Sequence, residues 1–282
     1  MDDLRSCHQC GAEYSGHIYH REFLTRHRVP AMSLLEFVDE TEGRELSLAV
    51  VNRQAPRPLQ QMLERMFVGQ EVDVRDIEIE EEVQDMVYLL DGEDIVAKSP
   101  LAAVQESILL VNSDLYVTGA RELDAVDLPA VIEGLENVPF RLRGYPESNK
   151  EKLLLITVSR YIERLALEND GGTHRASFQR LSRINDEQGT RAVYERLAQT
   201  DTDTHVYGMP DWTPPPEFEV TMHGGWDGDF RDSWFVVHVP EDDSLPHAAL
   251  VAIEVESRTW KGLWTYDIDT VREINRHIER EL

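Results

Sequence analysis

The sequence predicts an α/β protein of mixed α+β type, with two modules built on mixed sheets and a short Cys/His-rich arm in front. Three observations predict this class. Apolar runs typical of strands alternate with helical patterns over most of the 282 residues, both cysteines precede Pro30, and a Gly/Pro stretch at 144–146 precedes a long helical pattern. We therefore expect an arm over residues 1–30, a first module over 31–143 and a second module over 144–282.

The first module is expected to begin with a helix whose cap is Ser33. The apolar run 45–52 is typical of a buried strand, whereas 71–79 alternates polar and apolar residues like a half-exposed strand. Pro100 suits the first position of a helix. The expected elements are helix 33–40, strand 45–52, helix 58–67, strand 71–79, two strands around an Asp-Gly turn within 85–99, helix 100–111, and a further helix within 122–146 that leads to the linker.

The second module is expected to open with a long helix over 148–170, with Ser148 as its cap and Gly171 and Gly172 as its stop. Strand-like runs then dominate the sequence up to an amphipathic C-terminal segment. The expected elements are strand 173–182, helix 187–200, strands 203–211, 218–223, 233–239, 247–257 and 262–267, and a final helix over 267–282.

The charge is far from zero. The formal net charge is -26, and only four of the 28 basic residues are lysine (Lys98, Lys150, Lys152 and Lys261). Abundant ions screen such self-repulsion over a few ångströms, so we expect the cytoplasm of a salt-loving microbe; an ordinary acidic bacterial protein is the alternative. Since phosphate contacts weaken steeply with salt and an acidic surface repels nucleic acid, we expect no DNA binding by the bulk of the chain.

The sequence also bears on location. It shows no leader of secretory type, and its longest apolar runs, 153–158 and 248–255, fall far short of the roughly 18 to 20 residues that span a bilayer. We therefore expect a soluble, cytoplasmic protein with no membrane partner.

Motifs of several enzyme classes were sought by their mechanism. The sequence contains no GxxxxGK[ST] phosphate loop, GxGxxG dinucleotide turn, GxSxG elbow or HExxH zinc motif. Three acidic pairs could bind a hard cation: Asp201/Asp203, Glu254/Glu256 and Asp267/Asp269. In a chain with 54 acidic residues such pairs also arise from composition alone, so a metal-dependent hydrolase is one alternative hypothesis rather than the main one.

Aromatic residues gather in the last third of the chain. Trp226, Trp234, Trp260, Trp264 and Tyr266 lie within about forty residues. His223 and His238 are interleaved with them. Alternation along a strand would place several of these rings on one face, where they could hold a flat ligand or fill the core of the sheet.

Five segments of the second module, in order, resemble the DICT sensory domain, especially versions from salt-loving archaea. They are SRYIERLA (159–166), SFQRLS (177–182), YERLAQTDTDTHVYGMPD (194–211), SWFVVHV (233–239) and KGLWTYD (261–267). With the upstream stretch SLLEFVDETEGRELSLAVVN (33–52), the resemblance covers about 32–282. It implies signal input, because DICT domains accompany cyclic-dinucleotide enzymes, histidine kinases and DNA-binding regulators, and a link to light has been suggested. The family offers no established catalytic residues.

The main hypothesis is a non-enzymatic sensory protein that binds a small effector or a partner protein and acts through a signalling or regulatory partner. Arg160 and Glu163, spaced i,i+3, have the alternative of a surface ion pair. The candidate effector-binding residues are Arg160, Glu163, Gln179, Tyr207, Trp234, Trp264 and Tyr266.

The arm contains CHQCGAEYSGHIYH (7–20), where Cys7 and Cys10 have the spacing of a zinc knuckle. If the segment from Gly16 is helical, His17 and His20 share one face and complete a tetrahedral set with the two thiolates. The segment also resembles a C2H2 finger, although Phe23 stands where the first histidine ligand belongs. A zinc-binding arm would allow a transcriptional regulator whose Arg5, Arg21, Arg26 and Arg28 meet phosphate; the alternative is a tail with two free thiols.

Overall fold

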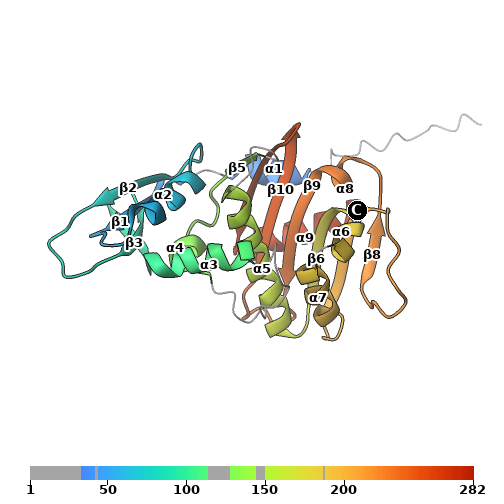
Figure 1. Ribbon diagram of the computed structural model, residues 1–282. Helices are drawn as coiled ribbons and strands as arrows, with labels where there is room; N and C mark the ends of the chain where they lie inside the picture. Colours follow the sequence, from blue (N-terminus) through green and yellow to red (C-terminus); the bar gives the residue numbers. More distant parts are fainter. Residues whose placement is uncertain (1–32, 42–43, 114–127, 144–149, 187) are drawn as a thin grey trace, which may run out of the picture. The chain divides into compact units, whose positions relative to one another are not determined.

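The computed structural model describes residues 33–41, 44–113, 128–143, 150–186 and 188–282, and residues 32–282 form one compact unit (Figure 1). It contains helices and two mixed sheets, as the sequence predicted. The first sheet has the order β2-β1-β3-β4, with β2 parallel to β1 and the other pairs antiparallel. Its strands are β1 (Leu46–Val51), β2 (Asp73–Ile77), β3 (Met86–Asp91) and β4 (Asp94–Pro100).

The two faces of the first sheet are covered differently. Leu48, Val50 and Leu89 lie in the largest core cluster, together with residues of helices α2 (Arg57–Met66), α3 (Leu101–Ser113) and α4 (Ala130–Glu133). Ala49 and Val51 point to the other side, where loop residues after β2 cover them. This alternation along one strand explains why the whole of β1 is buried.

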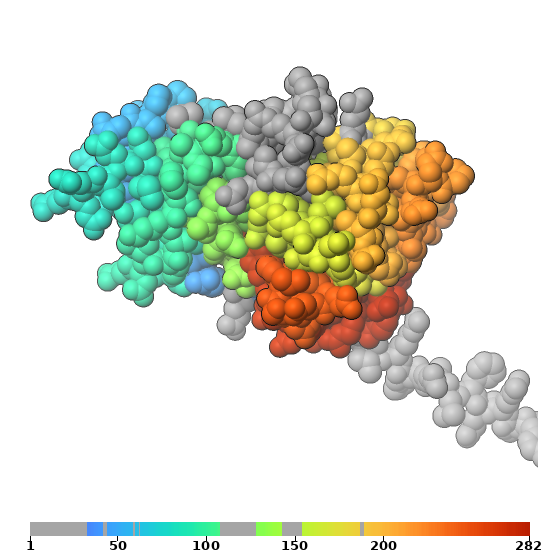
Figure 2. All heavy atoms as spheres, turned by 90° about the horizontal axis from the view of Figure 1, so that it is seen from below, coloured from blue at the N-terminus to red at the C-terminus, as the bar shows by residue number. Residues whose placement is uncertain are grey.

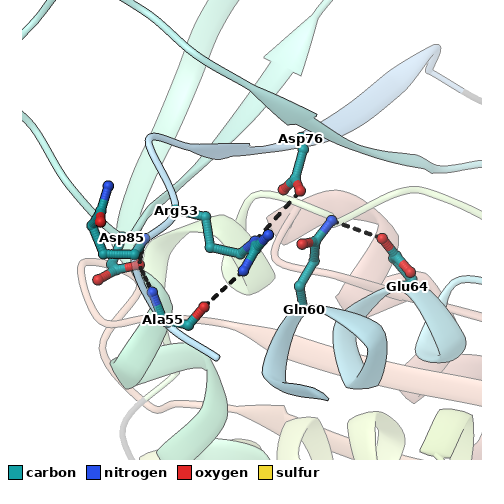
Figure 3. A network of polar contacts seen from close by, with 7 residues as sticks. Arg53, Ala55, Gln60, Glu64, Asp76 and Asp85 are labelled. Atoms are coloured by element: carbon teal, nitrogen blue, oxygen red, sulfur yellow. Dashed lines mark hydrogen bonds and ion pairs between the residues drawn. The ribbon is translucent and has the colours of Figure 1, made fainter. Parts of the chain in front are cut away.

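Hydrogen bonds fix the turn that leads from β1 into α2 (Figure 3). The Asp85 carboxylate accepts bonds from the backbone N–H groups of Gln54 and Ala55, both at 2.7 Å. Arg53 donates to the carbonyl of Ala55 at 2.8 Å and contacts Asp76 at 3.4 Å. These side chains bond to the backbone and to each other within the turn, so we assign them a structural role.

The second sheet has the order β5-β11-β10-β9-β6-β7-β8; β7 runs parallel to β6 and β8, and the other pairs are antiparallel. Its strands are β5 (Phe140–Arg143), β6 (Thr173–Arg180), β7 (Asp203–Met209), β8 (Thr221–Gly224), β9 (Ser233–Val239), β10 (Ala248–Glu256) and β11 (Thr259–Thr265). The helix expected within 122–146 is found in the described part only as the short α4, and Phe140–Arg143 form the strand β5. Phe140 and Leu142 alternate with arginines and bury their side chains in the core, which favours a strand.

One face of the second sheet, here called the α5 face, is covered by α5 (Lys150–Asn169), α6 (Ser182–Asp186) and α7 (Gln188–Leu197). Leu155, Val158, Ile162 and Ala166 of α5 recur at helical spacing and are all buried against strands such as β9 and β10. This core continues without a break to the helices of the first sheet.

The opposite face, here called the α9 face, is covered by α9 (Ile268–Glu281), α8 (Gly228–Asp232) and α1 (Leu34–Asp39). The Asp267 carboxylate caps α9 by accepting a bond from the N–H of Thr270 at 2.9 Å. Although α1 precedes the first sheet in sequence, Phe37 and Val38 pack on the second sheet with Val251 and Ile274.

Two elements that precede the boundary predicted at 143/144 pack with the second sheet. The helix α1 packs on that sheet, and the strand β5 is one of its strands. Gln70, after α2, also exchanges two hydrogen bonds with the backbone of Arg141 in β5, at 2.6 and 2.7 Å. The division into modules stays a prediction. In the described ranges, no helix combines the length and apolarity needed to cross a membrane.

Candidate effector-binding groove

An open cavity of about 610 Å³ lies where β4, α4, α5 and the loop after β9 meet. Its lining includes Ala97 of β4, Glu133 of α4, Tyr161 of α5 and His247 just before β10, and Tyr266 closes it beyond the end of β11. In Figure 2 the yellow-green surface of α5 meets the orange-red surface of the loop that follows β9. We call this cavity the groove.

Two tyrosines form an aromatic corner in the groove. The rings of Tyr161 and Tyr266 have centroids 6.2 Å apart and planes 88° apart. Tyr161 lies on α5, and the Tyr161 hydroxyl contacts a Glu133 carboxylate oxygen at 3.4 Å. The Tyr266 hydroxyl is buried and has no hydrogen-bond partner among the described residues. A buried hydroxyl without a partner is costly.

Carboxylates line the same corner. Glu133 ends α4, and Glu136 follows it at a place where one carboxylate oxygen accepts a bond from the backbone N–H of Tyr266 at 3.1 Å. Burial raises the pKa of the Tyr266 hydroxyl well above its ordinary value, and Tyr161, Glu133 and Glu136 raise it further. The Tyr266 phenol therefore stays protonated, and both carboxylates are close enough to affect its pKa.

His247 borders the groove from the loop that follows β9. Its side chain is only 1% exposed, and its Nδ1 lies 3.2 Å from the carbonyl oxygen of Leu245. A carbonyl can only accept, so Nδ1 carries a proton in this contact. The Nε2 atom is buried, and no hydrogen-bond partner for it occurs in the part of the chain that the structure describes.

A chain of buried polar side chains continues from His247 under the α5 face. Burial, and next the nearby His247, lowers the pKa of His238 to about 4, and His238 Nε2 lies 2.9 Å from the side-chain amide of Asn169. The His238 and His174 rings are 6.2 Å apart, and His174 has a pKa lowered to about 3, by burial first and then by His238. Both imidazoles are therefore uncharged at neutral pH.

The polar chain ends at an ion pair between two helices. His174 Nε2 lies 3.4 Å from the hydroxyl of Tyr194, which donates to Glu163 at 3.2 Å. The other Glu163 oxygen accepts a bond from Arg160 at 2.7 Å, and Arg160 also donates to Thr190 of α7 at 2.9 Å. Burial, and next the charge of Glu163, raises the pKa of Tyr194 well above its ordinary value. Groove and ion pair are thus joined through side chains of the sheet and of α5 and α7.

The structure distributes the seven predicted residues over several places, so they do not line one pocket. Tyr266 lies in the groove, and Arg160 and Glu163 lie in the polar chain. The alternative of a surface ion pair is wrong, because the side chains of Arg160 and Glu163 are only 10% and 5% exposed. Trp264 is 2% exposed in the core and Trp234 packs against the same core, while Gln179 sits at an irregularity of β6 with a φ of 59°.

Tyr207 belongs to a separate polar cluster on the α9 face. Its hydroxyl accepts a bond from Arg175 at 2.6 Å, and its ring stacks on His223 with centroids 4.3 Å apart. Arg175 also donates to Asn275 at 2.8 Å and lies 3.9 Å from a carboxylate oxygen of Glu279. Burial raises the pKa of Tyr207, whereas the Arg175 charge opposes that rise.

Sequence reasoning missed four groove residues: Glu133, Glu136, Tyr161 and His247. Glu133 and Tyr161 lie 28 positions apart, and Glu136 and Tyr266 lie 130 apart. Their residue types are ordinary for an acidic chain. Only Tyr161 carried a usable signal, since it falls in the predicted helix beside Arg160.

The predicted zinc ligands Cys7, Cys10, His17 and His20 lie outside the described residues. Within the ranges that are described, no cluster of three or more His, Cys, Asp or Glu side chains is suited to hold a metal ion. The acidic pairs of the hydrolase hypothesis have visible structural partners. Asp267 caps α9, Asp203 lies 2.9 Å from His205, and Glu254 accepts a bond from the backbone of Arg258 at 2.5 Å.

Comparison with known proteins adds one finding. Residues 133–254 match the family model described as DICT, the sensory domain in diguanylate cyclases and two-component systems. The resemblance inferred from the sequence is confirmed over this range, which is less than half of the 282 residues and shorter than the expected 32–282. The match begins at Glu133 and contains Glu136, Tyr161 and His247 of the groove, whereas Ala97 and Tyr266 lie outside it. No curated protein and no solved structure matches the chain.

Proposed function

We propose that the chain is a non-enzymatic sensory module whose groove binds a small effector and that passes the binding event to a signalling or regulatory partner protein. The sensory role has the support of the DICT match over 133–254. The observation that carries the proposal is the aromatic corner of Tyr161 and Tyr266 in a groove of about 610 Å³, with a buried Tyr266 hydroxyl that a ligand could satisfy.

The polar chain supplies a route from effector to output. A ligand that contacts His247 or Tyr161 changes the surroundings of His238 or of α5, and these connect to Glu163, Arg160 and α7 through buried side chains. Buried polar side chains interact strongly because the local dielectric is low. We propose that α5 and α7 are the elements whose position the effector biases, and that a partner protein reads that change in the cytoplasm.

The test is to identify what co-purifies with the protein expressed in its source cells. Small molecules released by denaturation are measured by mass spectrometry for the wild type and for Ala130→Trp, which places an indole in the groove from an exposed position of α4. The matched control is Ala102→Trp, at an exposed position of α3. We expect one compound enriched with the wild type and with Ala102→Trp, and lost with Ala130→Trp. Equal recovery from all three proteins would contradict the proposal.

A further inference from the structure

Two buried polar atoms beside the groove, His247 Nε2 and the Tyr266 hydroxyl oxygen, have no partner among the described residues, and both can accept a hydrogen bond. In the neutral tautomer in which Nδ1 donates to the carbonyl of Leu245, Nε2 of His247 is a buried acceptor. His247 is 1% exposed, so it is almost fully shielded from bulk water. A buried acceptor without a donor is costly.

The neighbouring acceptors carry negative charge. Glu133 and Glu136 each use one carboxylate oxygen in the contacts with Tyr161 and Tyr266, which leaves a second oxygen on each. Asp243, on the loop side of the groove, is already paired with Arg272 and is not one of these acceptors. Among the described lining residues there is no lysine or arginine, and Arg272 and Arg164, which contact Asp243 and the Tyr161 ring, are not lining residues.

The tyrosine rings fit the same kind of ligand. Perpendicular aromatic rings with a nearby carboxylate are the arrangement that proteins use to hold organic cations, since the ring face is electronegative. Tyr161 and Tyr266 meet at 88° beside Glu133 and Glu136. The Tyr161 ring already has one cation over it: the guanidinium of Arg164 lies 5.3 Å from its centroid.

We propose that the groove selects a small organic cation, a molecule whose protonated amine or guanidinium group donates to Glu133, Glu136 and the His247 side and whose apolar body lies against Tyr161 and Tyr266. This assignment rests on the proposed effector-binding function and names the chemical class of the effector. General attraction to an acidic surface would not give this selectivity. Surface carboxylates are hydrated, whereas His247 Nε2 and the Tyr266 hydroxyl at the groove are buried.

The experiment compares probes of one shape and different charge. Butylguanidinium, the neutral butylurea and the anionic butanoate are titrated into the full chain by ligand-observed NMR. The variant Glu133→Gln/Glu136→Gln keeps the size of both side chains and removes their charge. The matched control is Glu78→Gln/Glu80→Gln, which removes two exposed carboxylates of the first sheet's loop.

We expect saturable binding of butylguanidinium, at least about tenfold weaker binding of butylurea, and a loss of about tenfold or more in the Glu133/Glu136 variant but not in the Glu78/Glu80 variant. Butylurea or butanoate that binds as tightly as butylguanidinium would overturn the cation assignment. If Ala130→Trp abolishes that binding, the groove still stands as the effector site. Binding of butylguanidinium that both charge variants weaken equally would also overturn it, because that result marks general attraction to an acidic surface.

Discussion

The two faces of the seven-stranded sheet each bury an arginine, but they compensate its charge differently. On the α5 face, Arg160 has a carboxylate partner, Glu163, that is itself buried, at 2.7 Å. On the α9 face, Arg175 is bonded mainly to the neutral groups of Tyr207 and Asn275. Its nearest carboxylate partner in the described chain, Glu279, is 3.9 Å away and 61% exposed.

This difference indicates which polar groups contribute most to the stability of the fold. The α5-face ion pair sits at the end of a buried chain of histidine and tyrosine side chains that reaches the groove. The α9-face cluster lies near the β7–β8 edge of the sheet and includes the half-buried His223 and His205, 2.9 Å apart. We therefore expect the α5 face to couple stability with effector binding, and the α9 face to be tolerant.

The largest expected effect is that of Glu163→Gln. This change removes the buried carboxylate that Arg160 contacts at 2.7 Å, and breaking such a buried ion pair costs about 3 to 5 kcal/mol of unfolding free energy. The matched change Glu279→Gln on the α9 face should cost well under about 1 kcal/mol, because that pair is long and exposed. Both are measured by urea denaturation. Similar losses for the two variants would show that the faces do not differ as described.

Trp264→Ala separates core packing from ligand contact. The side chain is 2% exposed and packs on Phe140, with ring centroids 5.7 Å apart, so its loss should cost about 3 to 5 kcal/mol. Trp264 does not line the groove. The affinity of the folded variant for butylguanidinium should therefore stay within about twofold of the wild type, by the same NMR titration. A large loss of affinity at unchanged stability would move the effector site onto the core aromatics.

The histidines of the α5 face make stability depend on pH. His174 and His238 have pKa values lowered from 6.5 to about 3 and about 4, so the unfolded chain binds more protons than the folded chain between about pH 6.5 and pH 4. Stability is then present above pH 6.5 and falls as the pH drops through this window. Between pH 7 and pH 5 each histidine should contribute a loss of about 2 kcal/mol.

The variant His238→Gln tests this assignment through the slope rather than through absolute stability. The difference in unfolding free energy between pH 7 and pH 5 should shrink by about 2 kcal/mol, whatever the cost of the substitution itself. If the dependence of unfolding free energy on pH is unchanged, the pKa of His238 is not lowered in the folded protein.

The smallest effect on stability is expected for Tyr266→Phe. The Tyr266 hydroxyl is buried without a partner in the described part of the chain, so its removal should leave unfolding free energy unchanged or raise it by up to about 1 kcal/mol. The same variant should weaken butylguanidinium binding, because the hydroxyl oxygen is one of the acceptors of the groove. A clear loss of stability would show that the hydroxyl already has a structural partner.

Much of the fold could be predicted from local sequence patterns. The helical spacing of the long helix and the apolar alternation of β9 and β10 placed those elements within a few residues. The strand β5 was missed because only four residues form it and its pairing partner, β11, is more than a hundred residues away. The position of α1 on the second sheet likewise depends on contacts with residues far away in the sequence, such as Val251 and Ile274.

The groove was harder to predict for the same physical reason. Tyr266 was selected because aromatic residues cluster near it, and Arg160 and Glu163 because of their spacing on one helix. Glu136 and His247 gain their meaning only from neighbours that the fold brings together, Tyr266 and His238. The burial of Arg160 depends on α7, which no pattern within α5 reports.

The central claim is that the effector meets the α5 side of the sheet, at Tyr161 and Tyr266. It is tested most directly by NMR of protein carrying ring-labelled tyrosine while a small-molecule extract of the source cells is added. The account predicts that the Tyr161 and Tyr266 resonances move saturably, and that the resonance of Tyr207, on the α9 face, does not. Movement of Tyr207 with Tyr161 and Tyr266 unchanged would place the effector site on the other face and contradict the claim.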